Sequence, residues 1–225
     1  MPAQYRPVRG KRHFTANTYY SDIDWNDESA AIQKFKEQLE GWYIRPIESL
    51  IATSPHYGFT VIALTCVLID TLSQYYFGKE SSSQTLFKNF LTDHFPHFGN
   101  KFPTPILDNS NPKKPQPVEN YADAVYRAFR CGILHEAHVL LYAVVHDDAP
   151  VVQYFEKADI TRYVNGNECP TVVISPTKFF EEIKTVVFED YFQKLLTSDP
   201  QWDDLRTKFK TKFLVSYGID IGKEP

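Results

Sequence analysis

The chain has 225 residues and a formal net charge of −4, from 24 Lys and Arg against 28 Asp and Glu. This charge argues against a high-affinity binder of duplex DNA, because that affinity comes mainly from neutralising phosphates. The composition is 43% hydrophobic and 23% charged, which is ordinary for a globular protein that needs no disulfide or metal to hold its core. With 17 Phe and 14 Tyr, the interior is expected to be filled by aromatic rings.

The three cysteines, Cys66, Cys131 and Cys169, are far apart and form no CxxC pair. They predict neither a zinc ribbon nor a disulfide framework, and free thiols in a reducing cytoplasm are expected. The N-terminal residues lack the apolar core of a signal peptide. The longest apolar stretch, 61–69, is far shorter than the roughly 20 residues that span a bilayer. We therefore expect a cytoplasmic protein that makes no contact with a membrane.

Apolar residues at helical spacing predict most of the chain to be α-helical. The first predicted helix covers 29–52, and Pro46 is expected to kink or split it. The second, 57–77, is apolar nearly all round, which predicts a buried central helix that ends at Gly78. Further helices are predicted over 83–95, 119–134, 177–196 and 200–217.

The remaining segments lack this period. Residues 1–28 are predicted to be a flexible arm, 96–118 an exposed proline-rich loop, and 218–225 a tail. Short β-branched and aromatic runs within 138–175 predict a small antiparallel meander, with a hairpin at Asn165-Gly166. The predicted fold is thus mainly α, a single helical-bundle domain over 29–217 with a β insert, 138–175, before its last two helices.

The most informative motif is Arg130-x4-His135, at the end of the helix predicted over 119–134. Arginine presents a rigid fork of donors that matches phosphate oxygens. Histidine can take a proton from a 2′-hydroxyl or give one to a leaving 5′-oxygen near neutral pH. Together these residues suit cleavage of an RNA phosphodiester, with Arg130 and His135 as catalytic residues and no metal or other cofactor.

The segment resembles the Arg-x4–6-His motif of the HEPN superfamily. The resemblance covers the helical parts, 29–136 and 176–217, and leaves out the arm and the β insert. It implies a HEPN-like helical bundle, frequent homodimerisation and metal-independent endoribonuclease activity, in many members as part of bacterial defence or toxin systems. Other members bind RNA or nucleotides without cleaving them. Cys131 departs from the pattern, because the residue after the arginine is often Asn, Asp or His.

The five-residue offset has a geometric consequence. On a straight α-helix it turns the chain by about 140°, so Arg130 and His135 would face different ways. The two side chains can converge if the helix ends or distorts near Gly132. Alternatively, two subunits pool their copies across a two-fold axis, which predicts a homodimer with the two Arg130 residues near that axis.

Three neighbours of the motif are candidates for supporting roles. Asp70, near the end of the central helix, could orient Arg130 or His135, or it could simply mark where that helix reaches solvent. Arg127 and His138 flank the motif and are candidates for binding substrate phosphates. For each of them a solvated surface role is the alternative.

The sequence therefore predicts a metal-independent endoribonuclease that forms a homodimer and acts on RNA, single-stranded rather than duplex. The expected partners include no DNA. The alternative is a catalytically inactive HEPN-like module that binds RNA, nucleotides or another protein. The basic run over 206–212 is a possible RNA track, or else a solvated helix face.

Overall fold

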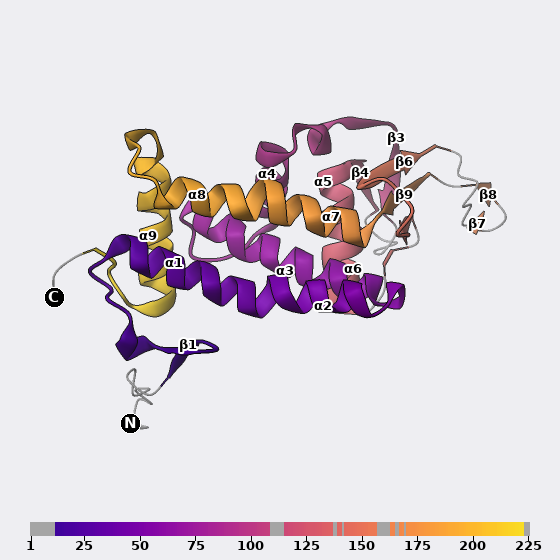
Figure 1. Cartoon of the computed structure of the whole chain (residues 1–225). Helices are drawn as coiled ribbons and strands as arrows, with labels where there is room; N and C mark the ends of the chain where they lie inside the picture. Colours follow the sequence, from indigo (N-terminus) through magenta and orange to yellow (C-terminus); the bar gives the residue numbers. More distant parts are fainter. Residues whose placement is uncertain are drawn as a thin grey trace, which may run out of the picture.

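The computed structural model describes residues 12–108, 115–136, 139–140, 142–156, 163–164, 167–168 and 170–222. Two long helical rods lie side by side, with a third helix packed behind them and in contact with both (Figure 1). The first rod joins α1 (Glu28–Leu39), the π-helical segment η3 (Glu40–Ile44) and α2 (Arg45–Thr53). The second joins α7 (Pro176–Glu182), the π-helical segment η7 (Ile183–Glu189) and α8 (Asp190–Leu196).

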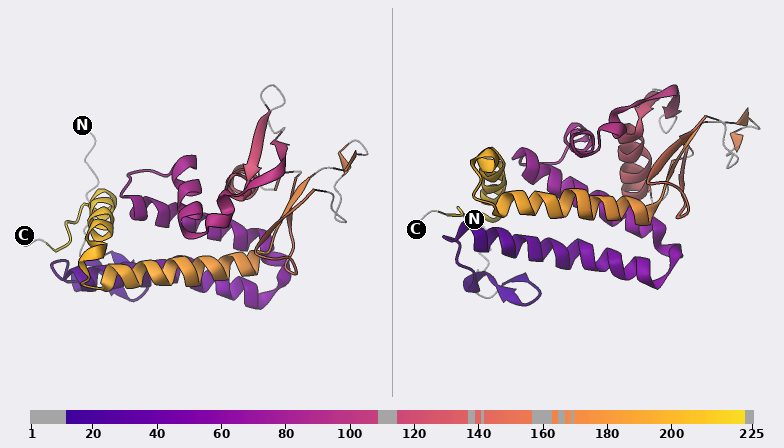
Figure 2. Two further views of the ribbon diagram at one scale, coloured as in Figure 1. Left: turned by 90° about the horizontal axis from the view of Figure 1, so that it is seen from above. Right: turned by 45° about the horizontal axis from the view of Figure 1, so that its top comes forward.

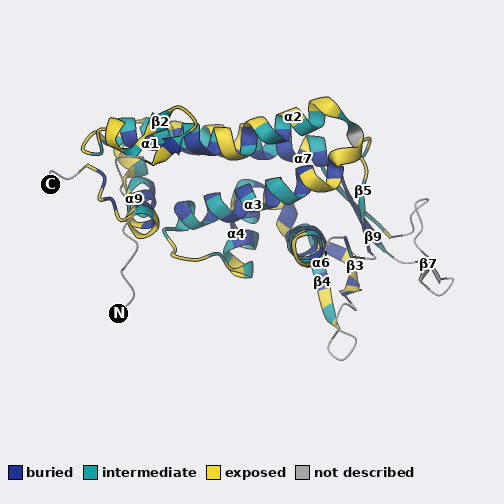
Figure 3. Ribbon diagram, turned by 90° about the horizontal axis from the view of Figure 1, so that it is seen from below, coloured by how far each residue is buried: buried dark blue, intermediate teal, exposed yellow. Residues whose placement is uncertain are grey.

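The central helix is α3 (Gly58–Phe77), which follows the short 3-10 helix η4 (Pro55–Tyr57). It contacts α2, α7, α4 (Gln84–His94) and α9 (Asp203–Tyr217), and α9 crosses one end of the rods (Figure 2). The helices bury the sides that face one another and expose their outer sides (Figure 3). By length and composition α3 could cross a membrane, but 61% of its apolar window is buried, as in the core helix of a soluble protein.

The helix predictions are confirmed, and their ends have visible causes. Ser83 caps α4 by accepting a hydrogen bond from the Leu86 amide, and Asn120 caps the helix that follows it in the same way. Gly78 and Gly218 end α3 and α9 in the left-handed conformation, with φ of 63° and 65°. Pro46 does not split its helix, because the π-helical η3 directly before it makes room for a residue that has no N–H.

The fourth predicted helix is built of three pieces that form one continuous rod. These are α5 (Tyr121–Ala124), the π-helical segment η6 (Val125–Cys131) and α6 (Gly132–Glu136). The rod packs on α3 and α4 at the end of the bundle opposite α9 (Figures 1 and 2). Two further 3-10 helices are η5 (Pro96–Gly99) and η8 (Pro200–Trp202).

The prediction of an exposed loop over 96–118 is wrong. Strands β3 (Lys101–Asp108) and β4 (Gln116–Asn120) form an antiparallel hairpin that buries Phe102, Ile106 and Val118. The strand over 101–108 was not predicted because Pro103 and Pro105 lie within it, and proline cannot donate a hydrogen bond to a β-ladder. The structure accommodates them where the register shifts, between Lys101 and Ile106.

The β insert is present, but its topology differs from a meander. Strands β5 (Ala143–Val145), β6 (Val152–Phe155) and β9 (Thr171–Ile174) form a sheet in the order β5-β9-β6, in which β5 runs parallel to β9 and β6 antiparallel to it. Asn165 and Gly166, where the hairpin was predicted, lie outside the described residues. The strands on either side of them, β7 (Tyr163–Val164) and β8 (Asn167–Glu168), pair with each other in antiparallel fashion. The central strand β9 is buried along its whole length.

The described part of the predicted arm is not loose. It forms β1 (His13–Thr15), β2 (Thr18–Tyr19) and the 3-10 helix η2 (Tyr20–Asp22). Phe14 is only 1% exposed, and the Gln38 amide donates a 2.7 Å hydrogen bond to its carbonyl oxygen. In the predicted tail, Ile219 and Ile221 are buried as well. The expected aromatic interior is confirmed, because the largest fully buried side chains are Phe and Tyr, among them Phe35 and Phe209.

Candidate functional site

The candidate site begins with the winding of η6. A π-helix bonds residue i to residue i+5, so side chains five residues apart lie above one another instead of pointing apart. At the end of this segment the Gly132 amide donates to the carbonyl oxygens of Arg127 and Phe129. The divergence expected on a straight α-helix does not apply, because the helix changes from π to α winding at Gly132, which is one of the two routes to convergence.

Arg130 and His135 are in contact within one chain. Arg130 Nη1 lies 3.1 Å from His135 Nε2. A guanidinium can only donate, so a hydrogen bond between these two atoms requires Nε2 to be the acceptor, with the ring proton on Nδ1. His135 is exposed and the Arg130 side chain is 19% exposed, so the pair lies at the surface of the bundle. A nitrogen that accepts a hydrogen bond in this way can also accept a proton.

Asp70 orients the guanidinium from behind. It lies on α3 with 9% of its surface exposed, and its Oδ2 accepts a 2.9 Å hydrogen bond from Arg130 Nε. Its Oδ1 accepts a 2.6 Å hydrogen bond from the hydroxyl of Ser82, in the loop between α3 and α4. Of the two roles considered for Asp70, the buried position and these contacts match the orienting one.

The charge state of Arg130 follows from this pair. Burial acts to lower the pKa of Arg130, but the charge of Asp70 and the hydrogen bond to it outweigh burial and raise that pKa above its ordinary value. The guanidinium is thus held as a cation. Among the described residues, its Nη2 has no hydrogen-bond partner, which leaves one fork nitrogen open to an oxyanion.

Two further side chains border the pair. Cys131 Sγ lies 3.9 Å from Arg130 Nη1, and the centre of the Tyr126 ring lies 5.5 Å from Arg130 Cζ.

Cys66, on α3, is fully buried. Burial, with the charge of Asp70 as a smaller cause, raises the pKa of Cys66, which favours the protonated thiol over the nucleophilic thiolate. Both described cysteines, Cys66 and Cys131, are free.

Not every predicted residue joins the pair. Arg127 forms an ion pair with Asp108 of β3, at 3.7 Å between Nη1 and Oδ2, so its charge is engaged by the hairpin. His138 lies outside the described residues. The described chain holds no group of three or more His, Cys, Asp or Glu that could bind a metal ion.

The basic run on α9 does not form a free track. Lys208 pairs with Asp204 and Lys210 with Glu28, at 2.6 and 2.7 Å, and Arg206 pairs with Asp203. The fourth member, Lys212, donates to the carbonyl oxygen of Glu80. Because each of these cations already has an acceptor, the run matches the alternative of a helix face that serves the fold.

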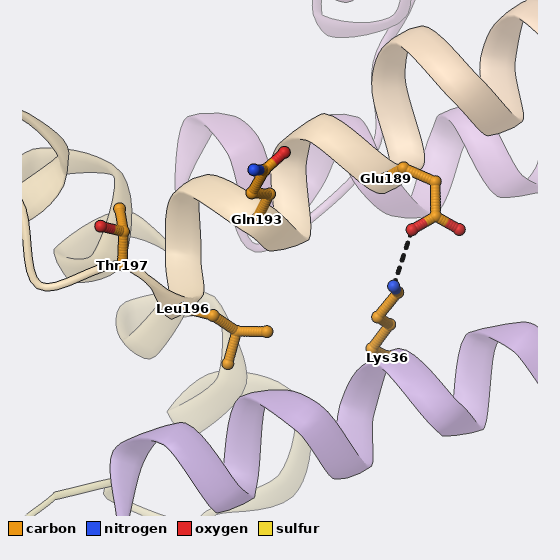
Figure 4. A pocket seen from close by; sticks show the side chains of 5 residues that line it. All are labelled: Lys36, Glu189, Gln193, Leu196 and Thr197. Carbon is orange, nitrogen blue, oxygen red and sulfur yellow. Dashed lines mark hydrogen bonds and ion pairs between the residues drawn. The ribbon is translucent and has the colours of Figure 1, made fainter.

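An open hollow of about 490 Å³ lies elsewhere on the surface, between α1 and α8 (Figure 4). Lys36 and Glu189 form an ion pair of 2.7 Å across one end of it. Its remaining lining residues are Gln193, Leu196 and Thr197. The hollow contains none of the residues around Arg130, and its two charges neutralise each other.

Ser82 is the member of the site that the sequence did not reveal. It stands in a run of three serines between two predicted helices, where nothing in the spacing points to Asp70.

Comparison of the chain with protein-family models, with curated proteins and with solved structures gives no match. The feature of the described chain that points to a function is the contact of Arg130 with His135, held by Asp70 and Ser82.

Proposed function

We propose that this protein is a metal-independent endoribonuclease of HEPN type. The observation that carries the proposal is the 3.1 Å contact between Arg130 Nη1 and His135 Nε2 at the surface of the bundle. It brings a fixed cation and a proton acceptor to one point, and these are the two groups that phosphodiester cleavage by a 2′-hydroxyl requires.

In the proposed reaction, Arg130 binds the scissile phosphate through Nη1 and Nη2, and the phosphate displaces His135 from Nη1. His135 Nε2 then accepts the proton of the 2′-hydroxyl as the 2′-oxygen attacks phosphorus. The bond from phosphorus to the 5′-oxygen breaks, and the 5′-oxygen takes a proton from water and leaves as a hydroxyl. His135 returns the proton that it accepted to the resulting hydroxide, so that no net proton is gained or lost. The products are a 2′,3′-cyclic phosphate and a 5′-hydroxyl.

The substrate proposed is single-stranded RNA, in which the 2′-hydroxyl can rotate into line with the leaving 5′-oxygen. DNA is excluded as a substrate of this mechanism because it lacks the attacking group. A homodimer and a role in defence remain expectations that the HEPN resemblance supplies, and the cytoplasmic location remains an expectation from the scattered cysteines and the N-terminal sequence. The homodimer no longer has the support of the five-residue offset, because one chain brings Arg130 and His135 together.

The test is cleavage of a labelled single-stranded RNA by the purified protein in EDTA. We expect cleavage that leaves a 2′,3′-cyclic phosphate, a loss of at least about 100-fold in the variant His135→Ala, and none of that loss in the control His97→Ala. His97 is an exposed histidine on η5. Products that carry a 5′-phosphate, or cleavage of a 2′-O-methyl RNA, would overturn the mechanism.

The second candidate is a protein that binds RNA without cleaving it. One observation favours it: Arg130 already has Asp70 on Nε and His135 on Nη1, so a phosphate must compete for the fork. The same experiment separates the two candidates. RNA that is retained by the protein on a filter, weakened by Arg130→Ala but never cut, would support the binding role.

A further inference from the structure

Each oxygen of the Asp70 carboxylate accepts one side-chain hydrogen bond from the described residues. Oδ2 accepts from Arg130 Nε at 2.9 Å and Oδ1 accepts from Ser82 Oγ at 2.6 Å. A carboxylate held at one oxygen can still rotate about its Cβ–Cγ bond. Held at both oxygens, it presents Oδ2 to Arg130 in one orientation, and that orientation aims the rest of the guanidinium at His135.

The loop between α3 and α4 brings Ser82 back to this level of α3. Gly78 has φ of +63°, and the Lys79 amide donates to the Gln74 carbonyl oxygen at 2.9 Å, so the chain reverses at the end of α3. A Cβ at Gly78 would lie 3.1 Å from Lys208 Cα of α9. The turn is therefore both left-handed and closely packed, which glycine allows.

Helix α9 fixes the loop from outside. The Lys212 side chain donates a 2.7 Å hydrogen bond to the Glu80 carbonyl oxygen, and Lys212 is only 8% exposed. Glu80 is two residues before Ser82, so this contact limits where the serine hydroxyl can lie. On the other side of Ser82, Ser83 is the N-cap of α4.

We propose that Ser82 is a positioning residue for the site, which acts by holding Asp70 so that Asp70 aims the Arg130 fork at a phosphate. The proposal rests on the proposed function, since it assigns Ser82 a part in that reaction. Ser82 itself does not touch the substrate. Its loss should lower kcat more than it raises KM, because a misaimed fork stabilises the charge of the transition state less than it should.

The three consecutive serines supply matched controls. Ser81 is exposed, Ser82 donates to Asp70, and Ser83 accepts from the Leu86 amide at 3.2 Å. The variants Ser81→Ala, Ser82→Ala, Ser82→Thr and Ser83→Ala remove or keep these contacts one at a time. Each is measured for kcat and KM on the labelled RNA, and for the NMR signal of the Arg130 Nε–H group, which Arg130→Lys identifies by its absence.

We expect Ser82→Ala to lower kcat about tenfold, the scale of residues that orient a functional side chain. We also expect it to shift the Arg130 Nε–H signal. Ser82→Thr, which keeps the hydroxyl, should restore most of both. Ser83→Ala should lower thermal stability through the lost cap and leave kcat and the signal in place, and Ser81→Ala should change neither.

The two proposals fail in different ways. A wild-type protein that does not cleave RNA contradicts the proposed function, while the Arg130 signal still shows whether Ser82 holds the guanidinium. A Ser82→Ala protein with the wild-type signal and wild-type kcat overturns the role of Ser82 and leaves the ribonuclease intact. A loss of kcat as large in Ser83→Ala as in Ser82→Ala would show that the loop matters only as a structural element.

Discussion

Arg130 lies near the end of the π-helical segment η6 and His135 lies on α6, and Arg130 Nη1 is 3.1 Å from His135 Nε2. The winding of one helix therefore does what a second subunit would otherwise have to do. A site complete within one chain needs no partner for its chemistry. The residues that tune it are those that hold the two side chains from behind, above all Asp70.

The first prediction concerns the guanidinium fork. Arg130→Lys keeps a positive charge but cannot bond Asp70 and present two parallel donors to a phosphate at the same time. We expect kcat for RNA cleavage to fall by about 100-fold, as when one donor to a developing oxyanion is removed. Arg45→Lys is the control, because the Arg45 side chain is 67% exposed on α2. Equal rates for the two variants would remove Arg130 from the mechanism.

A second prediction concerns the stability that the Asp70–Arg130 pair supplies. Asp70→Asn leaves a largely buried guanidinium without its counter-charge, and we expect the free energy of unfolding to fall by about 1–3 kcal/mol. Asp190→Asn breaks the i, i+4 pair with Lys194, whose side chains are 40% and 30% exposed, and should cost less than about 0.5 kcal/mol. Urea denaturation monitored by tryptophan fluorescence measures both. Equal losses would show that Asp70 and Arg130 are not coupled in solution.

The third prediction is a dependence of stability on pH that arises at His94. Burial, reinforced by the charge of Lys194, lowers the pKa of His94 below its ordinary value of 6.5. Between that value and the lower folded one, the unfolded chain binds more protons than the folded protein, so stability falls as the pH falls through this window. Above it His94 is neutral in both states and contributes no slope.

Unfolding in urea at a series of pH values from about 7.5 down to about 5 tests this prediction. The variant His94→Gln should lose part of the acid slope, whereas His56→Gln, at an exposed position, should keep it. An unchanged slope in His94→Gln would assign the acid sensitivity to other groups.

The fourth prediction concerns assembly. Tyr57, Phe59 and Leu134 are 41%, 46% and 40% exposed, and they belong to η4, α3 and α6, of which η4 and α6 each contact α3. Apolar side chains exposed on adjoining elements are typical of an interface. We expect a homodimer by light scattering, and its conversion to a monomer by Leu134→Lys at micromolar concentration. Val215→Lys, on α9, is the control. A monomeric wild-type protein would contradict the dimer without affecting the single-chain site.

Most helices could be predicted, because apolar residues at helical spacing are enough to identify an amphipathic helix from its sequence alone. The spacing of Ile32, Phe35 and Leu39 fixes α1, and capping residues such as Ser83 mark where helices begin. The β3–β4 hairpin could not be predicted, because Pro103 and Pro105 are typical of loops and the register shift that accommodates them depends on the partner strand.

The site was only half predictable for a related reason. The chemistry of Arg130 and His135 follows from the residue types. Their meeting within one chain depends on a change from π to α winding at Gly132, and the sequence offered such a distortion only as one of two routes to convergence. The role of Ser82 was harder to predict, because its contact with Asp70 requires a loop conformation that α9 holds through Lys212. Such contacts join segments far apart in the chain, so spacing along the sequence does not show them.

The contact between Lys212 of α9 and Glu80 of the α3–α4 loop has a consequence for the order in which the parts of the site form during synthesis. Lys212, which binds Glu80, lies far beyond Arg130 and His135 in the chain and leaves the ribosome after them. Until α9 docks, the loop that carries Ser82 lacks its outer support, and Asp70 lacks a firmly held partner on Oδ1. A ribonuclease built this way would align its arginine only once α9 had folded onto the rest of the bundle.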